Sequence, residues 1–296
     1  MKSMIIRQWI MAVALCLWVL SAMAGEAVDE TRSVEANGRI LIDIPRGTVK
    51  VFAWEKSAVQ VQGQLDDRTE AFTFEVDDHM TVIKVRIPES TYFGEGSRLD
   101  IFVPTENKVS FRGVSSDIEI NKTRGGVTTR TVSGNVLLKK VDSRIEVNTV
   151  SGHVRVDSGQ GRLKVVTVSG DMEIDYHAEE VDLQTVSGDI EAALVSVSRL
   201  RIQTVSGDVG ATAGTVDSAT LDLETVSGDV MLGLADSVDA RITVTTGPGG
   251  DIYNRLTKEV PEEIFPGQVK LVGQAGEGKG RIRINTVTGD VHLKKE

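Results

Sequence analysis

Residues 181–190 read VDLQTVSGDI, and the tetrapeptide Thr-Val-Ser-Gly inside this stretch occurs six times in the chain. The six copies begin at Thr131, Thr149, Thr167, Thr185, Thr204 and Thr225. The first four starting positions follow one another at a constant step of 18, and the next two steps are 19 and 21. Repeats of about this length are typical of solenoids, in which each unit packs mainly against its neighbours. The repeat therefore predicts a stack of similar units instead of one closed core.

Each unit is predicted to contain two short strands joined at a corner. Before the motif, aliphatic residues such as Val181 and Leu183 alternate with polar residues such as Asp182, which is the pattern of a half-buried strand. Ser-Gly-Asp follows, and glycine and aspartate both favour a turn. A second strand then begins at an aliphatic residue. These aliphatic residues are Val136, Val154, Met172, Ile190, Val209 and Val230.

Stacked units would form parallel sheets, with equivalent positions on neighbouring strands about 4.8 Å apart. The central outward position of the first strand is charged in five successive units, and its sign alternates at every step. These residues are Glu146, Lys164, Asp182, Arg201 and Asp222. Opposite charges on neighbouring strands attract, whereas a slip by one unit would bring like charges together. The alternation predicts an in-register stack; a solvated face with a chance order of charges is the alternative.

Residues 1–24 have the features of a secretory signal peptide. Lys2 and Arg7 precede an apolar run at residues 9–20, and Ala22-Met23-Ala24 supplies a cleavage site after Ala24. An uncleaved anchor is the alternative, although the run is short for a membrane-spanning helix. We expect export to the periplasm or cell surface, with membrane contact only through this segment before cleavage.

Composition argues against some partners and some chemistry. The 296 residues include 33 Lys and Arg and 43 Asp and Glu, giving a net charge of −10, or −12 when residues 1–24 are removed. This negative charge argues against nucleic acid as a partner. The only cysteine, Cys16, lies in the signal segment, so we expect no disulfide in the mature chain.

The repeats predict an all-β fold, a single-domain parallel β-solenoid of about ten short coils with an irregular N-terminal cap. We expect a signal peptide at 1–24, the N-terminal cap and irregular β coils at 25–112, and regular repeats at 113–252. Prolines and a glycine cluster predict a surface insertion at 253–279. A terminal coil follows at 280–296, and its charged last residues are of the kind that protect an exposed sheet edge.

Three further segments complete the pattern. Residues 38–51 resemble a degenerate coil, residues 99–104 read LDIFVP, and a strand near the mature N-terminus contains Trp54. With the repeats, these segments resemble the bacterial exported putative adhesin family with β-strand repeats, over nearly the whole mature chain. The resemblance implies a Ser-Gly-Asp repeat solenoid of unknown function, an envelope or surface location, and no established catalytic residues.

The sequence offers little for catalysis. His79, His153, His177 and His292 show no metal-ligand spacing, and no hydrolase or phosphate-loop motif is present. We expect a protein that is not an enzyme and has no cofactor. The alternative is a polysaccharide-acting enzyme that uses surface carboxylates. A cleft with two carboxylates about 5–10 Å apart, away from the corner, would favour that alternative.

An acidic residue follows the corner glycine in several units and is the candidate for a metal site. The residues are Asp171, Asp189, Asp208 and Asp229. Stacked carboxylates about 5 Å apart repel unless hydrogen bonds or a cation such as Ca²⁺ offset the charge. Asn135 and His153 occupy the same position in two other units. Turn capping is therefore the main interpretation, and cation binding is the alternative.

The valine of the motif decides whether the stack has an apolar interaction stripe. If strict alternation persists into the corner, threonine and serine point inward and valine points outward. If the chain kinks at threonine, valine turns inward and serine faces solvent. The six valines are Val132, Val150, Val168, Val186, Val205 and Val226. In either case threonine lies inside or at the corner, which argues against a flat ice-binding threonine face.

The function that we expect is therefore binding, adhesion or scaffolding in the bacterial cell envelope by an exported, non-catalytic β-solenoid. The expected partners are an envelope protein, a glycan or a second copy of the chain.

Overall fold

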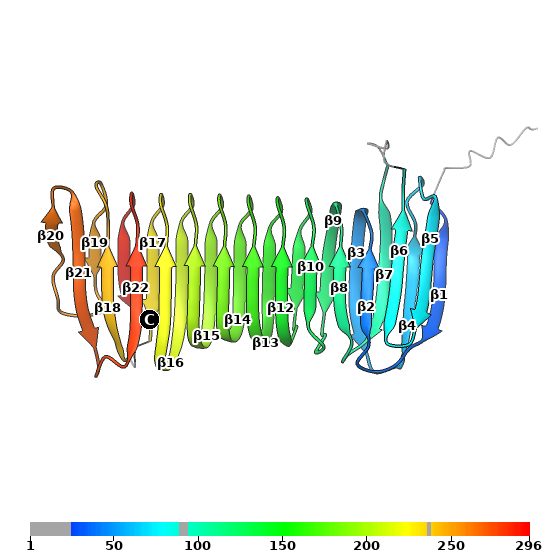
Figure 1. The fold of residues 1–296 in the computed structure, drawn as a ribbon, viewed down its shortest axis with the longest axis horizontal. Coiled ribbons are helices and arrows are strands. Elements are labelled where there is room, and N and C mark those ends of the chain that lie inside the picture. Colours follow the sequence, from blue (N-terminus) through cyan, green and yellow to red (C-terminus); the bar gives the residue numbers. More distant parts are fainter. Residues whose placement is uncertain (1–24, 89–93, 236–237) are drawn as a thin grey trace, which may run out of the picture.

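The computed structural model describes residues 25–88, 94–235 and 238–296 (Figure 1). The expected signal peptide lies outside the described residues. The described part is an elongated stack of 23 strands joined by hydrogen bonds, which confirms the all-β prediction. In that part of the chain no helix is long and apolar enough to cross a membrane.

Strands that precede each corner form one parallel ladder, and strands that follow it form a second. The first ladder contains β8 (Lys108–Arg112), β10 (Val127–Arg130), β12 (Ser143–Asn148) and the C-terminal halves of β13 (Val154–Val166), β14 (Met172–Gln184), β15 (Ile190–Gln203) and β16 (Val209–Glu224). The second contains β9 (Ser115–Asn121), β11 (Val136–Lys139), the N-terminal halves of β13 to β16, and β17 (Val230–Leu234).

The register matches the charge alternation of the sequence. Glu146 pairs with Lys164, Lys164 with Asp182, Asp182 with Arg201, and Arg201 with Asp222. The Lys164 ammonium lies 3.6 Å from the Asp182 carboxylate. The longer steps between the last copies of the motif are absorbed as register shifts within β14 to β16, away from the Thr-Val-Ser-Gly corner. The predicted in-register alternation is confirmed.

Replacing Lys164 by Glu would place three acids side by side on consecutive strands. We expect a loss of about 1 kcal/mol in the free energy of unfolding at low salt, because repulsion replaces attraction. Urea unfolding at low and high salt measures it. Lys164→Gln, which removes attraction without adding repulsion, should cost less. A Lys164→Glu variant as stable as the parent at low salt would contradict the observed register.

The N-terminal coil lies inside the stack and not at its end. β2 (Arg39–Asp43) pairs with β8 on one side and β6 (Met80–Arg86) on the other, while β3 (Arg46–Trp54) lies between β9 and β7 (Ser97–Pro104). Residues 38–51 thus supply a coil, as their resemblance to the repeat predicts. Antiparallel strands complete this end. They are β1 (Ala27–Ser33), β4 (Ala58–Gln64) and β5 (Ala71–Asp77).

The C-terminal end departs from two expectations. β22 (Gly280–Asn285) and β23 (Val291–Lys295), the expected terminal coil, lie between the β16–β17 coil and the coil of β18 and β19. The expected surface insertion instead forms the hairpin that pairs antiparallel with β18 and covers this end. The remaining bounds are β18 (Ala240–Thr245), β19 (Ile252–Asn254), β20 (Glu262–Phe265) and β21 (Gln268–Ala275).

The observed order continues the charge alternation of the first ladder. The observed order places Arg283 beside Asp222, which extends the alternation by one strand. An order that followed the sequence would place Thr243 beside Asp222 instead. The backbone hydrogen bonds of a parallel ladder are the same for any strand of matching length, so side-chain pairs determine which strands are the more stable neighbours. The charged C-terminus of the last coil thus lies inside the stack and does not protect its end.

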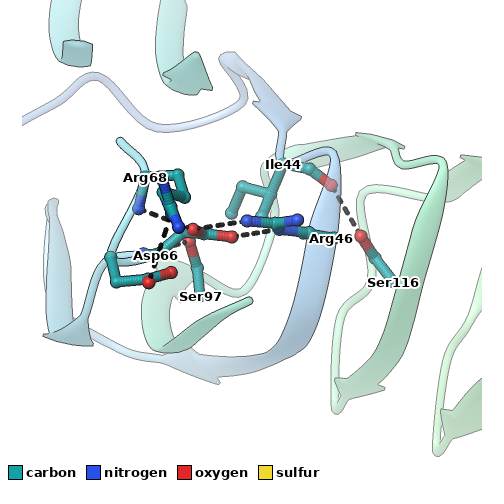
Figure 2. Close-up of polar contacts among 7 residues, drawn as sticks. Ile44, Arg46, Asp66, Arg68, Ser97 and Ser116 are labelled. Atoms are coloured by element: carbon teal, nitrogen blue, oxygen red, sulfur yellow. Dashed lines mark hydrogen bonds and ion pairs between the residues drawn. The ribbon is translucent and has the colours of Figure 1, made fainter. Parts of the chain in front are cut away.

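A buried ion pair joins the N-terminal cap to the first coils (Figure 2). Arg46, in the corner of β3, donates two hydrogen bonds to the Asp66 carboxylate, one of them from Nη2 at 2.8 Å. The Asp66 N–H donates to Ser97 Oγ, and the Arg68 N–H donates to Asp66 Oδ1. The Asp66 side chain is 1% exposed and that of Arg46 is 13% exposed. On the other side of the corner, Ser116 Oγ donates to the Ile44 carbonyl.

Candidate binding surfaces

The six Thr-Val-Ser-Gly corners place their threonine, valine and serine side chains alike. Threonine points into the core, where all six residues of this row are buried. Valine and serine are both exposed. Backbone bonds link each corner to the next; for example, the Ser187 N–H donates to the Val168 carbonyl and the Gly170 N–H donates to the Ser187 carbonyl. The inward threonine row is at odds with an ice-binding face, as the alternation predicts.

Serine is where strict alternation fails. The outward-valine alternative requires serine to point inward, yet Ser133, Ser151 and Ser169 are exposed like the valines that precede them. The chain is already turning at serine, and the next residue is a glycine, in most units with positive φ, so two consecutive side chains project from the convex side of the corner. The inward serine of the first alternative is therefore wrong, as is the inward valine of the second, so neither alternative describes the whole corner.

The corner glycine is required by its surroundings as well as by its backbone angle. Gly188 has φ of +141°, and a Cβ atom there would lie 2.4 Å from the carbonyl oxygen of Gly170 in the preceding coil. Gly207 and Gly228 meet the same obstacle at 2.2 Å. No side chain fits between backbones this close. The glycine row is thus the contact that lets successive corners stack directly.

The exposed valines form one continuous row along the corners. The six valines of the motif are joined by Val114 before them and Val287 after them, and all eight are 46–53% exposed. Paired serines hold consecutive corners in parallel, from Ser115 to Ser227 and then to Thr288, so the row follows the order of the coils. This feature, which we call the valine stripe, extends beyond the predicted row by one valine at each end.

The aspartates after the corner form a hydrogen-bonded ladder. The N–H of Asp189 donates to Oδ1 of Asp171 at 3.0 Å, that of Asp208 to Asp189 at 2.8 Å, and that of Asp229 to Asp208 at 2.8 Å. The same bond runs from the N–H of Asp290 to Asp229. Each carboxylate therefore accepts a hydrogen bond from the next corner, which offsets the repulsion between stacked charges.

This ladder accounts for the four aspartates without a cation. Within the described ranges, no group of three or more His, Cys, Asp or Glu side chains is arranged to hold a metal ion. The histidines do not converge either: His79 contacts Glu35 near the N-terminal end, and His292 stacks on Tyr253 near the C-terminal end. The geometry favours turn capping as the role of the aspartates.

Three carboxylates border a hollow of about 420 Å³ on the second ladder, away from the corner. They are Glu173, Asp175 and Glu191, and Glu173 pairs with Glu191 on the neighbouring strand. The enzyme alternative looks for a carboxylate pair in a hollow of this kind. However, all three residues are exposed, and Glu173 is held in an ion pair by Arg155. Glycoside hydrolysis needs a carboxyl group kept protonated by its surroundings, usually by burial. The hollow lacks that burial.

Comparison with known proteins gives one family match. A family model described as "Toastrack DUF4097" matches residues 37–294. No curated protein matches the chain.

Several solved structures also match, and three of them are bacterial proteins. A "putative cell adhesion protein" of Clostridium sporogenes is 12% identical, with a TM-score of 0.26, 92% of this chain covered and 100% of its own. A "putative adhesin" of Parabacteroides distasonis is 13% identical, with a TM-score of 0.46 and coverage of 70% and 97%. A "putative adhesin" of Bacteroides fragilis is 14% identical, with a TM-score of 0.42 and coverage of 90% and 97%.

Proposed function

Because the chain belongs to the Toastrack DUF4097 family, which spans residues 37–294, and presents an unbroken valine stripe, we propose that it is a non-catalytic binding or scaffolding protein. We further propose that it works in the bacterial cell envelope as a parallel β-solenoid of about ten coils. Residues 1–24 support export, since they have the composition of a signal peptide.

The observation that carries this proposal is the valine stripe itself. Soluble proteins rarely keep long contiguous apolar surface unless something binds it. The valine side chain projects outward from the corner and stays about half exposed, while threonine fills the interior. Threonine, which is also β-branched, shares the χ1 preferences of valine. Retention of an apolar residue at eight consecutive corners is therefore best explained by a partner that contacts the row, either an envelope component or a second copy.

The parallel repeat also suits such a partner. Neighbouring strands are about 4.8 Å apart, so the stripe offers apolar groups at a constant spacing along its length. A partner with an extended chain or its own repeat can meet many of them at once, and weak contacts then add. The carboxylates that border the 420 Å³ hollow are exposed, which argues against hydrolysis as the function.

Replacing Val168, Val186 and Val205 together by Thr tests the proposal. We expect the free energy of unfolding to change by about 0.5 kcal/mol or less, since the three side chains are exposed. Retention of the mature protein on envelopes of the source bacterium, or its self-association in sedimentation, should fall clearly.

The matched control replaces three exposed valines outside the stripe, Val195, Val260 and Val272, by Thr. This control should bind like the parent. Equal binding by the stripe variant and the parent would argue against the stripe. A loss of several kcal/mol in stability would show that the valines are core residues.

A further inference from the structure

A second surface feature lies on the first ladder, separate from the corner. A groove of about 310 Å³ crosses β12, β13, β14 and β15 on their outward side. Its charged lining residues are Arg144, Arg162, Lys164, Glu180, Asp182, Arg199 and Arg201. Five cations thus surround two carboxylates, in a chain whose net charge is −10. The groove is a local positive region on an acidic protein.

Three of these cations are already engaged by the two acids. Glu180 lies between Arg162 and Arg199, at 3.4 Å and 3.7 Å, and Lys164 lies 3.6 Å from Asp182. These contacts follow the parallel register, in which β13 and β15 carry positive pairs and β14 between them carries a negative pair. They are explained by the stability of the stack and need no ligand.

The remaining two arginines are different. Neither Arg144 nor Arg201 forms an ion pair with any residue that the structure describes. Arg201 lacks an ion pair among the described residues although it lies beside Asp182 and Asp222 on the neighbouring strands. Arg144 stands directly opposite Arg162, a like-charge pair on adjacent strands. Such a pair destabilises a sheet. The neighbouring row alternates its charges without a break, so this chain departs from its own pattern at the groove.

We propose that the groove binds the phosphate groups of an anionic ligand. A guanidinium presents a planar fork of donors that matches phosphate oxygens, and charge-assisted bonds of this kind are among the strongest on a protein surface. An anion held between Arg144 and Arg162 would replace their repulsion with two attractions. Arg199 and Arg201 lie further along the same groove, so a ligand with several phosphates contacts both ends.

Two kinds of ligand carry this chemistry, a soluble phosphate polymer and a phosphate-bearing lipid headgroup. Both would present repeated negative charge to the flat side of the stack. The groove is independent of the valine stripe, because it lies on the strands before the corner. A result that disproves binding at the groove therefore leaves the proposal for the valine stripe untouched, and the reverse also holds.

Titration calorimetry with tripolyphosphate at low salt tests the inference, with the double variant Arg144→Gln, Arg201→Gln. Both residues are exposed and unpaired among described groups, so the variant should fold. We expect binding at least tenfold weaker than that of the parent, and an affinity of the parent that falls as salt rises. Arg144→Gln alone should raise the melting temperature at low salt, because it removes repulsion from Arg162.

The control variant Lys139→Gln, Arg155→Gln removes two positive charges from the second ladder and should bind tripolyphosphate nearly as well as the parent. Vesicles of phosphatidylcholine with and without phosphatidic acid form the second arm. Binding of tripolyphosphate alone identifies a soluble polymer as the source, and vesicle binding that needs Arg144 and Arg201 identifies a headgroup. Equal losses in both double variants, or no binding of either probe by the parent, would overturn the proposal.

Discussion

Replacing Asp66 by Asn is expected to lower the free energy of unfolding by about 3–5 kcal/mol, the usual cost of removing one partner from a buried ion pair. The amide cannot balance the charge of Arg46, whose guanidinium is held away from water in the corner of β3 (Figure 2). The Asp66 carboxylate also accepts a hydrogen bond from the Arg68 N–H, and the Asp66 N–H donates to the hydroxyl of Ser97. Urea unfolding at pH 7 measures the loss.

The effect should depend on pH in a defined direction. The hydrogen bonds from Arg46 hold the pKa of Asp66 below its ordinary value of 3.8. A lowered pKa in the folded state stabilises the protein above the unfolded-state pKa, and this contribution is lost as pH falls through the folded-state pKa. The difference in the free energy of unfolding between the parent and Asp66→Asn should therefore be largest at neutral pH and shrink below about pH 4.

Two controls separate this pair from ordinary surface charge. Glu173→Gln breaks the exposed pair with Arg155 and should cost about 1 kcal/mol or less. Arg46→Met together with Asp66→Leu should recover much of the stability, because no charge is left buried. If Asp66→Asn costs no more than Glu173→Gln, the pair does not hold the cap to the stack.

Replacing Gly188 by Ala is the second large effect. The new Cβ would stand 2.4 Å from the Gly170 carbonyl oxygen, at a φ of +141° that residues with side chains rarely adopt. Backbone strain of about 1–3 kcal/mol and forced displacement of the neighbouring corner of similar size add to a loss on the order of 4 kcal/mol. Thermal unfolding of the purified variant measures it.

Gly210→Ala is the matched control for this prediction. Gly210 has no positive φ, and a Cβ there would meet nothing closer than 3.8 Å. Alanine should be neutral or stabilise by up to about 1 kcal/mol, since it restricts the unfolded chain. Similar losses at Gly188 and Gly210 would show that corner contact is not what requires glycine at 188.

The sequence predicts those features that depend on neighbours one coil apart. The constant period of the repeat determines which residues meet, and alternation determines which face inward, so the Lys164 ladder and the inward threonines follow directly. Serine exposure escapes this reasoning because alternation does not hold where the chain reverses direction. The full length of the valine stripe escapes it because Val114 and Val287 lie in imperfect copies of the motif.

Features that depend on distant segments could not be predicted in this way. Residues 39–54 and 280–295 enter the stack between coils that are remote in sequence, and period alone does not specify such an order. Arg46 and Asp66 are separated by β3 and β4, which lack the repeat motif, so no spacing rule points to their contact. The Arg144 groove depends on rows across four strands, and it becomes visible only when the register is known.

The proposed binding role is tested most directly by photo-crosslinking from the stripe in living cells. A photoreactive amino acid is placed at position 186 and, in a separate protein, at position 195, where the native valines are similarly exposed. The account predicts a discrete crosslinked product from position 186, shared by positions 168 and 205 and weak or absent from position 195. Equal products from positions 186 and 195, or none from any stripe position, would contradict it.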